Sequence, residues 1–283
     1  LGAYVDRLRE EAPHPAAKVG VVVAQGSIVD GEQPAGVIGG DTVASLIRQA
    51  REDDAIKAVV LRVDSPGGSA TASEVIRREL ELTRQAGKTV VVSMGSVAAS
   101  GGYWISMAAD EVWASPTTIT GSIGIFAMLP DLSGPMDKLG LTVDGIGTTP
   151  LSGGLDLRRP VDPQVANVLQ QTIEYGYRRF LAVVGTARKM SPEAVDAVAQ
   201  GRVWLGSQAK ERGLVDKLGG LDAALKSAAA RAGLTEYDVV YVEKPMSPRD
   251  QLLARLLDNG DEPDGTQPRP SLVETTLARL RSE

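Results

Sequence analysis

The sequence predicts an α/β fold whose parallel β-sheet is built from repeated βα units. Three apolar runs rich in valine are typical of strands that are buried on both faces of such a sheet: Lys18–Ala24, Ala58–Val63 and Thr89–Met94. Segments with helical periodicity follow these runs. Because parallel neighbours need a crossover connection, the alternation favours right-handed βαβ units.

The helices between these strands are predicted from their end signals. Asp41 and Thr42 are good capping residues for a helix that ends at about Arg51. Gly87 is a typical residue just after the end of a helix over about 71–85. Further along, a helix is predicted up to about Ala109, then strands at 112–114 and within 117–125, and recurring elements up to Gly154. A long helix is predicted over 163–188. Ser191 and Pro192 open another helix, and strands and helices alternate up to Val242.

Three segments are predicted along the chain. Residues 1–17 are read as a polar N-terminal helix and linker, because Pro13 and Pro15 disfavour helix. Residues 18–243 form the α/β domain. Residues 244–283 form a tail with a linker rich in proline, glycine and acidic residues, followed by a short amphipathic helix.

Composition excludes several classes of function. The 283 residues carry 30 Lys and Arg against 36 Asp and Glu, a net charge of −6, so no nucleic-acid partner is expected. There is no cysteine and only one histidine, His14, which excludes thiol catalysis and multi-histidine metal sites. We expect no metal or cofactor. No apolar run approaches the roughly 18 residues of a membrane span, and a first residue other than Met suggests a piece of a longer chain.

Two strand-to-helix junctions carry the chemical information. They are the segments Ser65–Ser69 and Ala98–Gly102, and both belong to the carboxyl edge of the predicted sheet, where ligands bind. Paired glycines allow close approach of the backbone to a ligand. The Gly67-Gly68 pair therefore fits either a tight turn or an oxyanion hole, and it does not fit a Walker P-loop.

Ser100 is the candidate nucleophile at the second junction. Its small neighbours Ala99 and Gly101 permit a sharp elbow that presents the hydroxyl group to a substrate, although a serine in this position also serves as a helix N-cap. A nucleophilic serine needs a base. His14 lies in the linker, and no lysine in the sequence stands out as a buried base.

Three motifs in order carry a resemblance to a known family: RVDSPGGSATASEVI, SMGSVAASGGYWISMAAD and TGSIGIF. Together they resemble signal peptide peptidase A (protease IV), a family of the Clp-protease/crotonase fold superfamily, and the likeness runs from about Lys18 to Val242. The resemblance implies that Ser100 is the nucleophile, that the N–H groups of Gly68 and Gly101 form the oxyanion hole, and that Ser122 orients a base lysine.

The resemblance also implies a biological setting. It predicts an oligomeric serine peptidase of the bacterial cell envelope, attached to the membrane on its extracytoplasmic face by a segment outside this sequence. The substrates implied are cleaved signal peptides and other hydrophobic peptides. An extended peptide is expected to add as a strand near the Ser65–Ser69 loop, with Ile123, Ile125 and Met128 either lining side-chain pockets or belonging to the core.

One departure from the family pattern concerns the base. Short members carry the base lysine in a segment that matches Gly147–Pro160, and here that segment has no lysine; Leu151 and Ser152 stand near the expected place. Long members are tandem duplications with the lysine in the N-terminal half. The resemblance therefore implies that this chain is a C-terminal half that holds half of a Ser-Lys site, and we expect the isolated chain to be nearly inactive.

Alternative interpretations stay open at this point. A crotonase-type acyl-CoA enzyme would use the same paired N–H groups, with a catalytic Glu or Asp in the pocket and no serine at the elbow. A non-catalytic assembly module would need no base. Lys138 folding back toward Ser100 would supply an internal base. The acids Asp64, Asp110 and Glu111 are read as solvated or capping residues.

Overall fold

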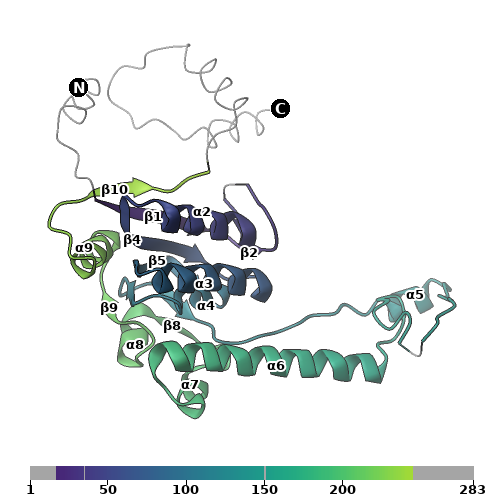
Figure 1. The fold of residues 1–283 in the computed structure, drawn as a ribbon. Coiled ribbons are helices and arrows are strands. Elements are labelled where there is room, and N and C mark those ends of the chain that lie inside the picture. Colours follow the sequence, from purple (N-terminus) through teal and green to yellow (C-terminus); the bar gives the residue numbers. More distant parts are fainter. Residues whose placement is uncertain (1–16, 35, 150, 245–283) are drawn as a thin grey trace, which may run out of the picture. The chain divides into compact units, whose positions relative to one another are not determined.

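The three valine-rich runs form adjacent parallel strands in the computed structural model (Figure 1). They are β1 (Lys18–Gln25), β4 (Ile56–Ser65) and β5 (Thr89–Ala99). The structure describes residues 17–34, 36–149 and 151–244, and all of these except Lys244 belong to the unit Pro15–Glu243. The predicted α/β class with a mostly parallel sheet is confirmed.

The main sheet has the order β10-β1-β4-β5-β6-β9, with β7 paired to β5 and β8 paired to β7. All of its pairings are parallel except that between β7 and β8, and β2 and β3 form a separate parallel pair. The remaining strands are β2 (Ile28–Val29), β3 (Ile38–Gly39), β6 (Glu111–Ala114), β7 (Ile119–Gly121), β8 (Val203–Leu205), β9 (Lys217–Leu218) and β10 (Asp238–Tyr241). The helices are α2 (Gly40–Glu52), α3 (Ala70–Gln85), α4 (Gly101–Ser106), α5 (Ser133–Lys138), α6 (Pro163–Arg188), α7 (Pro192–Val198), α8 (Gly206–Glu211) and α9 (Leu221–Arg231).

Alternate residues of the central strands feed two hydrophobic cores. On β4, Val59 and Leu61 pack with apolar residues of α2, α3 and α4, whereas Ala58 and Val60 pack against α9. These side chains are fully buried. Helices thus cover both faces of the sheet (Figure 1), which is why its strands read as continuous apolar runs rather than as alternating ones.

Strand β5 is longer than predicted because it contains a bulge. Its pairing with β4 shifts between Val63 opposite Met94 and Ser65 opposite Ala98, so two extra residues lie on the β5 side. The carboxylate of Asp64 accepts the N–H of Val97 at 2.9 Å within this bulge. The glycine and serine at 95–96 therefore continue the strand instead of ending it, and Asp64 is a structural acceptor.

Other element predictions need correction. The helix after Ser100 ends at Ser106 rather than near Ala109, and the strand within 117–125 is limited to Ile119–Gly121. Elements do not recur up to Gly154, because among the described residues of 122–162 only α5 is regular. The N-cap of α2 is Gly39, and Thr42 instead bonds the backbone of Gln33.

Two predicted helices agree closely with the structure. The long helix α6 spans Pro163–Arg188, with the carboxylate of Asp162 accepting the N–H of Gln164 at its start. Ser191 caps α7 through the N–H of Ala194, as its sequence predicted. The predictions for 1–16, including His14, and for the tail at 245–283 lie outside the described residues.

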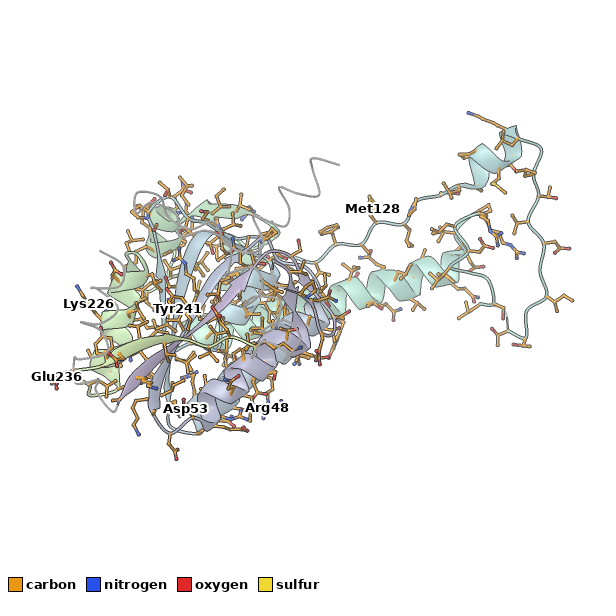
Figure 2. The ribbon with its side chains drawn as sticks, turned by 90° about the horizontal axis from the view of Figure 1, so that it is seen from above. Arg48, Asp53, Met128, Lys226, Glu236 and Tyr241 are labelled. Carbon is orange, nitrogen blue, oxygen red and sulfur yellow. The ribbon has the colours of Figure 1, made fainter. Side chains whose placement is uncertain are left out.

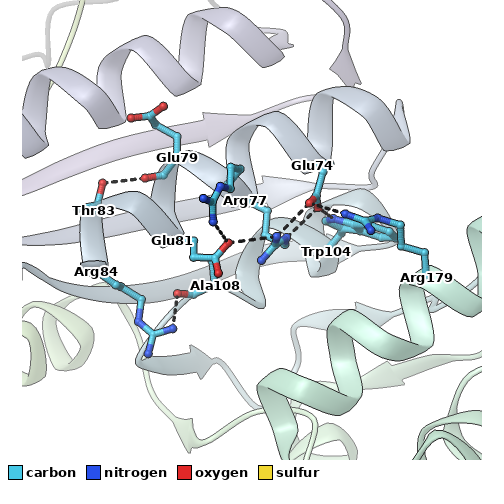
Figure 3. A network of polar contacts seen from close by, with 10 residues as sticks. Glu74, Arg77, Glu79, Glu81, Thr83, Arg84, Trp104, Ala108 and Arg179 are labelled. Atoms are coloured by element: carbon cyan, nitrogen blue, oxygen red, sulfur yellow. Dashed lines mark hydrogen bonds and ion pairs between the residues drawn. The ribbon is translucent and has the colours of Figure 1, made fainter. Parts of the chain in front are cut away.

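The carboxylate of Glu74 on α3 joins three helices (Figure 3). It accepts hydrogen bonds from Arg77 on its own helix, from the indole of Trp104 on α4 at 2.8 Å, and from Arg179 on α6 at 2.9 Å. Burial disfavours the charged form, but the bonds from Arg77, Trp104 and Arg179 outweigh it and lower the pKa of Glu74 to about 2. Glu74 therefore ties the helix that follows Ser100 to α6.

Replacing Leu61, which is fully buried, with Ala should lower the free energy of unfolding by about 2–5 kcal/mol because a cavity is left behind. Denaturant unfolding with an unchanged m-value measures this loss. The matched control is Leu218→Ala on the edge strand β9, where the side chain is 40% exposed and the expected loss is about 0.5 kcal/mol or less. Equal losses in the two variants would contradict the assigned core.

Glu74→Gln should lower the free energy of unfolding at neutral pH by about 1–3 kcal/mol, since charge-assisted hydrogen bonds are lost in a partly buried site. The folded pKa is depressed, so the stabilisation is fully present above the unfolded pKa near 4.5 and is lost as pH falls toward about 2. The difference between wild type and variant should therefore shrink over that window. Glu52→Gln, at an exposed acid of α2, is the matched control variant.

Candidate active site

Ser100 lies at a sharp junction between β5 and α4. Its backbone angles are φ 51° and ψ −118°, a left-handed conformation that is strained for a residue with a side chain. The N–H of Ser100 donates to the carbonyl of Gly121 at 2.9 Å, and its carbonyl accepts the N–H of Trp104 at 2.9 Å. The elbow that the small neighbours of Ser100 predicted is therefore present.

The Ser65–Ser69 loop lies directly against this elbow. A Cβ atom added to Gly67 would lie 2.7 Å from the nitrogen of Gly101 and 2.8 Å from Cβ of Ser100. A Cβ atom added to Gly68 would lie 2.0 Å from the carbonyl oxygen of Ile28. Both glycines also have positive φ, so glycine is required at 67 by the approach of the elbow and at 68 by the approach of Ile28.

The backbones of Gly68 and Gly101 lie close together, since a Cβ atom added to Gly101 would be 3.2 Å from the nitrogen of Gly68. The bridge between Ile28 and the loop uses the carbonyl of Gly67 at 2.9 Å and the N–H of Ser69 at 2.8 Å, which leaves the N–H of Gly68 outside the bridge. Gly101 is the first residue of α4, whose early N–H groups have no partner within the helix. The two backbones converge beside Ser100.

Ser122 lies at the same end of the sheet as Ser100 but follows a different strand, β7. Ala99 at the end of β5 pairs with Gly121 at the end of β7, so Ser100 and Ser122 each follow directly after a paired position. Ser122 also has a positive φ of 49°, and its N–H donates to the carbonyl of Arg202 at 2.7 Å. The structure thus brings together all four site residues predicted from the sequence.

Gly68, Ser100 and Ser122 open into a cleft of about 980 Å³, whereas Gly101 is buried and does not line it. One wall comes from the junctions, with Gly68, Ser100 and Ser122, and continues along the segment after β7 with Ile125 and Phe126. Of the three apolar candidates, Ile125 lines the cleft, whereas Ile123 is fully buried in the core. Met128 is 84% exposed and lies on the segment that leads away from the sheet (Figure 2).

The opposite wall was not predicted from the sequence. It consists of one face of α6 together with the turn after α7, and its residues are Gln170, Ile173, Glu174, Tyr177, Gln200 and Gly201. The four α6 residues are spaced at i, i+3, i+4 and i+7, which is the spacing of a single helix face. That spacing was available in the sequence, but nothing indicated what the face would meet.

Hydrogen bonds hold this second wall in position. The hydroxyl of Tyr177 donates to Asp196 and accepts the N–H of Gln200 at 3.2 Å. Burial and the bond to Asp196 raise the pKa of Tyr177 to about 12, so the phenol is neutral at physiological pH. Tyr177 therefore serves as a fixed hydrogen-bonding group rather than as a base.

None of the lysines within Pro15–Glu243 lines the cleft. Burial lowers the pKa of Lys88, but this residue precedes β5 and bonds the carbonyls of Ala50 and Asp53, at the other end of the strand from Ser100. Lys138 is exposed at the end of α5. Leu151 and Ser152 belong to a turn within 151–155 and do not line the cleft.

The acidic candidates are structural and lie outside the cleft lining. Asp110 accepts the N–H of Val90 at 2.9 Å. Glu111 is buried rather than solvated, and it accepts from Trp113 and Ser227 and pairs with Lys217. Within the part of the chain that the structure describes, no three His, Asp or Glu side chains gather in a way that suits a metal ion.

Comparisons with known proteins agree with the motifs. The sequence profile of peptidase family S49 matches residues 82–235. Protease 4 of Salmonella typhi is 46% identical over 251 residues, which are 89% of this chain and 40% of that protein. Protease 4 of Haemophilus influenzae is 49% identical over 227 residues, which are 80% of this chain and 37% of that protein. The chain therefore spans about two fifths of the length of these curated relatives.

A ClpP1 mutant from Listeria monocytogenes is similar in structure, with a TM-score of 0.47 and 15% identity over 72% of this chain and 94% of that one. The sequence matches confirm the predicted family. The chain belongs to peptidase family S49.

Proposed function

We propose that the protein is a serine endopeptidase of the Ser-Lys dyad type with Ser100 as its nucleophile. The observation that carries the proposal is the strained elbow of Ser100, which opens into a cleft shared with Gly68 and Ser122. Nucleophilic serines use such strand-to-helix junctions because the hydroxyl group then stands clear of the sheet.

The oxyanion hole is proposed to consist of the N–H groups of Gly68 and Gly101. When a peptide carbonyl carbon is attacked by Oγ of Ser100, its oxygen becomes negatively charged, and the two converging donors stabilise that charge. In other hydrolases one such donor contributes about 10²–10³ in turnover.

The base is proposed to be a neutral lysine from the N-terminal half of the same polypeptide, outside this sequence. The support is that no lysine of Pro15–Glu243 lines the cleft and that the relatives are much longer than this chain. The hydroxyl of Ser122 orients the lysine amine. The lysine takes the proton of Ser100, passes it to the leaving amine as the acyl-enzyme forms, and then activates the water that releases the acyl group.

The proposed substrates are cleaved signal peptides and other hydrophobic peptides. The apolar side chains of Ile125, Phe126 and Ile173 in the cleft support an apolar substrate. A peptide bound in extended form near the Ser65–Ser69 loop would be held by main-chain hydrogen bonds. No metal or cofactor takes part in these steps.

The protein is further proposed to form a homo-oligomer at the extracytoplasmic face of the bacterial envelope. Exposed apolar side chains on the segment around α5 support a homo-oligomer, and the largest exposed fractions are those of Phe126, Met128, Leu139 and Ile146. The extracytoplasmic face of the bacterial envelope follows from the family resemblance. Of the helices in the described residues, none has the length and apolarity that crossing a membrane requires.

One observation bears on the acyl-CoA alternative. A crotonase-type enzyme needs an acid in the pocket, and Glu174 does line the cleft. The serine at the elbow and the family membership favour the peptidase. The assembly-module alternative predicts a folded chain with an unreactive Ser100.

Labelling with a serine-reactive fluorophosphonate, followed by peptide mass mapping, tests the nucleophile. We expect Ser100 to be labelled in the full-length polypeptide and not in the isolated chain, and Ser100→Ala should abolish labelling. Loss of one catalytic partner typically costs about 10⁴–10⁶ in turnover. Labelling of the isolated chain would mean an internal base such as Lys138. Absence of labelling in both folded forms would contradict the peptidase proposal.

Ser122→Ala in the full-length polypeptide should lower turnover by less than loss of the base itself, for which the cost is about 10⁴–10⁶. The reason is that the lysine stays present but is less well oriented. The pH dependence of kcat/KM should shift as well, because a hydrogen bond to the amine is lost. A variant with wild-type turnover and pH profile would show that Ser122 has no such role.

A further inference from the structure

The α6 wall of the cleft carries a single carboxylate. Gln170, Ile173, Glu174 and Tyr177 share one face of the helix, and among the described residues that line the cleft Glu174 is the only one with a charged side chain at neutral pH. The wall opposite contributes glycines, serines and apolar residues. A charge in such a cleft acts on any peptide side chain placed beside it.

The charge of Glu174 is not neutralised inside the cleft. Its Oε1 accepts the amide of Gln170 at 2.9 Å, a neutral partner. The nearest cation is Arg178, with Nη1 at 3.9 Å from Oε2, and Arg178 does not line the cleft. The side chains of Arg178 and Glu174 are 67% and 52% exposed, so their pairing is weak.

The surroundings of this wall contain one further acid and one further cation, Asp196 and Arg202. Asp196 lies behind Tyr177, whose hydroxyl group donates to it and lowers its pKa, so this group is a second negative charge at the same wall. The guanidinium of Arg202 donates to the side chain of Gln200 and the carbonyl of Ala197, which are neutral, and its positive charge also lowers the pKa of Asp196. Because Arg202 offsets Asp196 and neither lines the cleft, Glu174 is the acid that adds a negative charge to the largely apolar lining.

We propose that Glu174 is a specificity-determining residue, which makes the cleft select peptides with a lysine or arginine close to the apolar residues at the cleavage site and reject acidic ones. The proposal rests on the proposed peptidase function and deepens it by naming the substrate class. A peptide with Lys in place of Glu beside this wall should bind about 3- to 10-fold more tightly, given two unit charges a few ångströms apart near a solvated surface.

The test measures peptide affinity on the Ser100→Ala protein, full-length, by fluorescence anisotropy, so that binding is read without cleavage. The probes are labelled apolar peptides that differ only by Lys, Gln or Glu at one position, scanned along the peptide. At one position or more, affinity should fall in the order Lys, Gln, Glu. The ratio between Lys and Glu should shrink as salt is raised, because exposed charges are screened.

Variants assign the effect to Glu174. In the same background, Glu174→Gln should bring the affinity ratio of the Lys and Glu peptides close to one, and Glu174→Lys should reverse it. The matched control Glu211→Gln, at a 75% exposed acid of α8 outside the cleft lining, should leave the ratio unchanged.

The outcomes separate this inference from the function on which it rests. Equal affinity for the three peptides, a ratio that persists in Glu174→Gln, or no binding of any peptide overturns the role of Glu174. The peptidase proposal is judged separately, by fluorophosphonate labelling and by cleavage of the same peptides with the unmodified protein. Cleavage without charge discrimination would refute this inference alone.

Discussion

The position of the candidate site depends on one strand that changes partners along its length. The first part of β5 pairs with β6, through Val91–Ser93, and the last part pairs with β7, through Val97–Ala99. A bulge separates these two parts of β5. At the bulge the N–H of Val97 donates to the carboxylate of Asp64 on β4. Ser100 and Ser122 meet because the ends of β5 and β7 are in register beyond this bulge.

The second wall of the cleft has a different physical origin. Helix α6 packs against the core through Phe180 and Val184. A hydrogen bond from Arg179 on α6 to Glu74 on α3 connects it to the helices beside Ser100. Glu74 also receives the indole of Trp104, which lies one turn after Ser100. The carboxylate of Glu74 thus connects α4, which follows Ser100, with α6, whose face lines the cleft. The low pKa of Glu74 keeps this carboxylate charged at any physiological pH.

Much of this architecture could be predicted, because burial and capping leave local marks in the sequence. The valine runs gave the central strands, and Pro163 and Ser191 marked two helix starts that the structure confirms. The continuation of β5 through Gly95 could not be predicted, since that glycine lies in a bulge whose partner is Asp64 on another strand. Glu111 was misjudged for a similar reason, because Trp113, Ser227 and Lys217 satisfy it only once the chain is folded.

The same distinction applies to the site. The motifs around Gly68, Ser100 and Ser122 are local, and the structure brings these residues together at one cleft. Glu174 and Tyr177 were not predicted as cleft residues, because the sequence does not indicate which surface a helix face of mixed polar and apolar residues will contact. The segment Gly147–Pro160, where the family resemblance implies a base lysine, contains none, and no lysine of Pro15–Glu243 lines the cleft.

Backbone strain gives a reason to regard the cleft as formed before any base reaches it. Four described residues other than glycine have positive φ, and three of them line the cleft: Ser100, Ser122 and Gln200. Such conformations cost about 1–3 kcal/mol each, so they persist only where other contacts fix them. Each of the three is held by its own N–H, to the carbonyl of Gly121, the carbonyl of Arg202 and the hydroxyl of Tyr177. Because these acceptors all belong to this chain, the strained backbone at Ser100 and Ser122 is held in place without the proposed lysine.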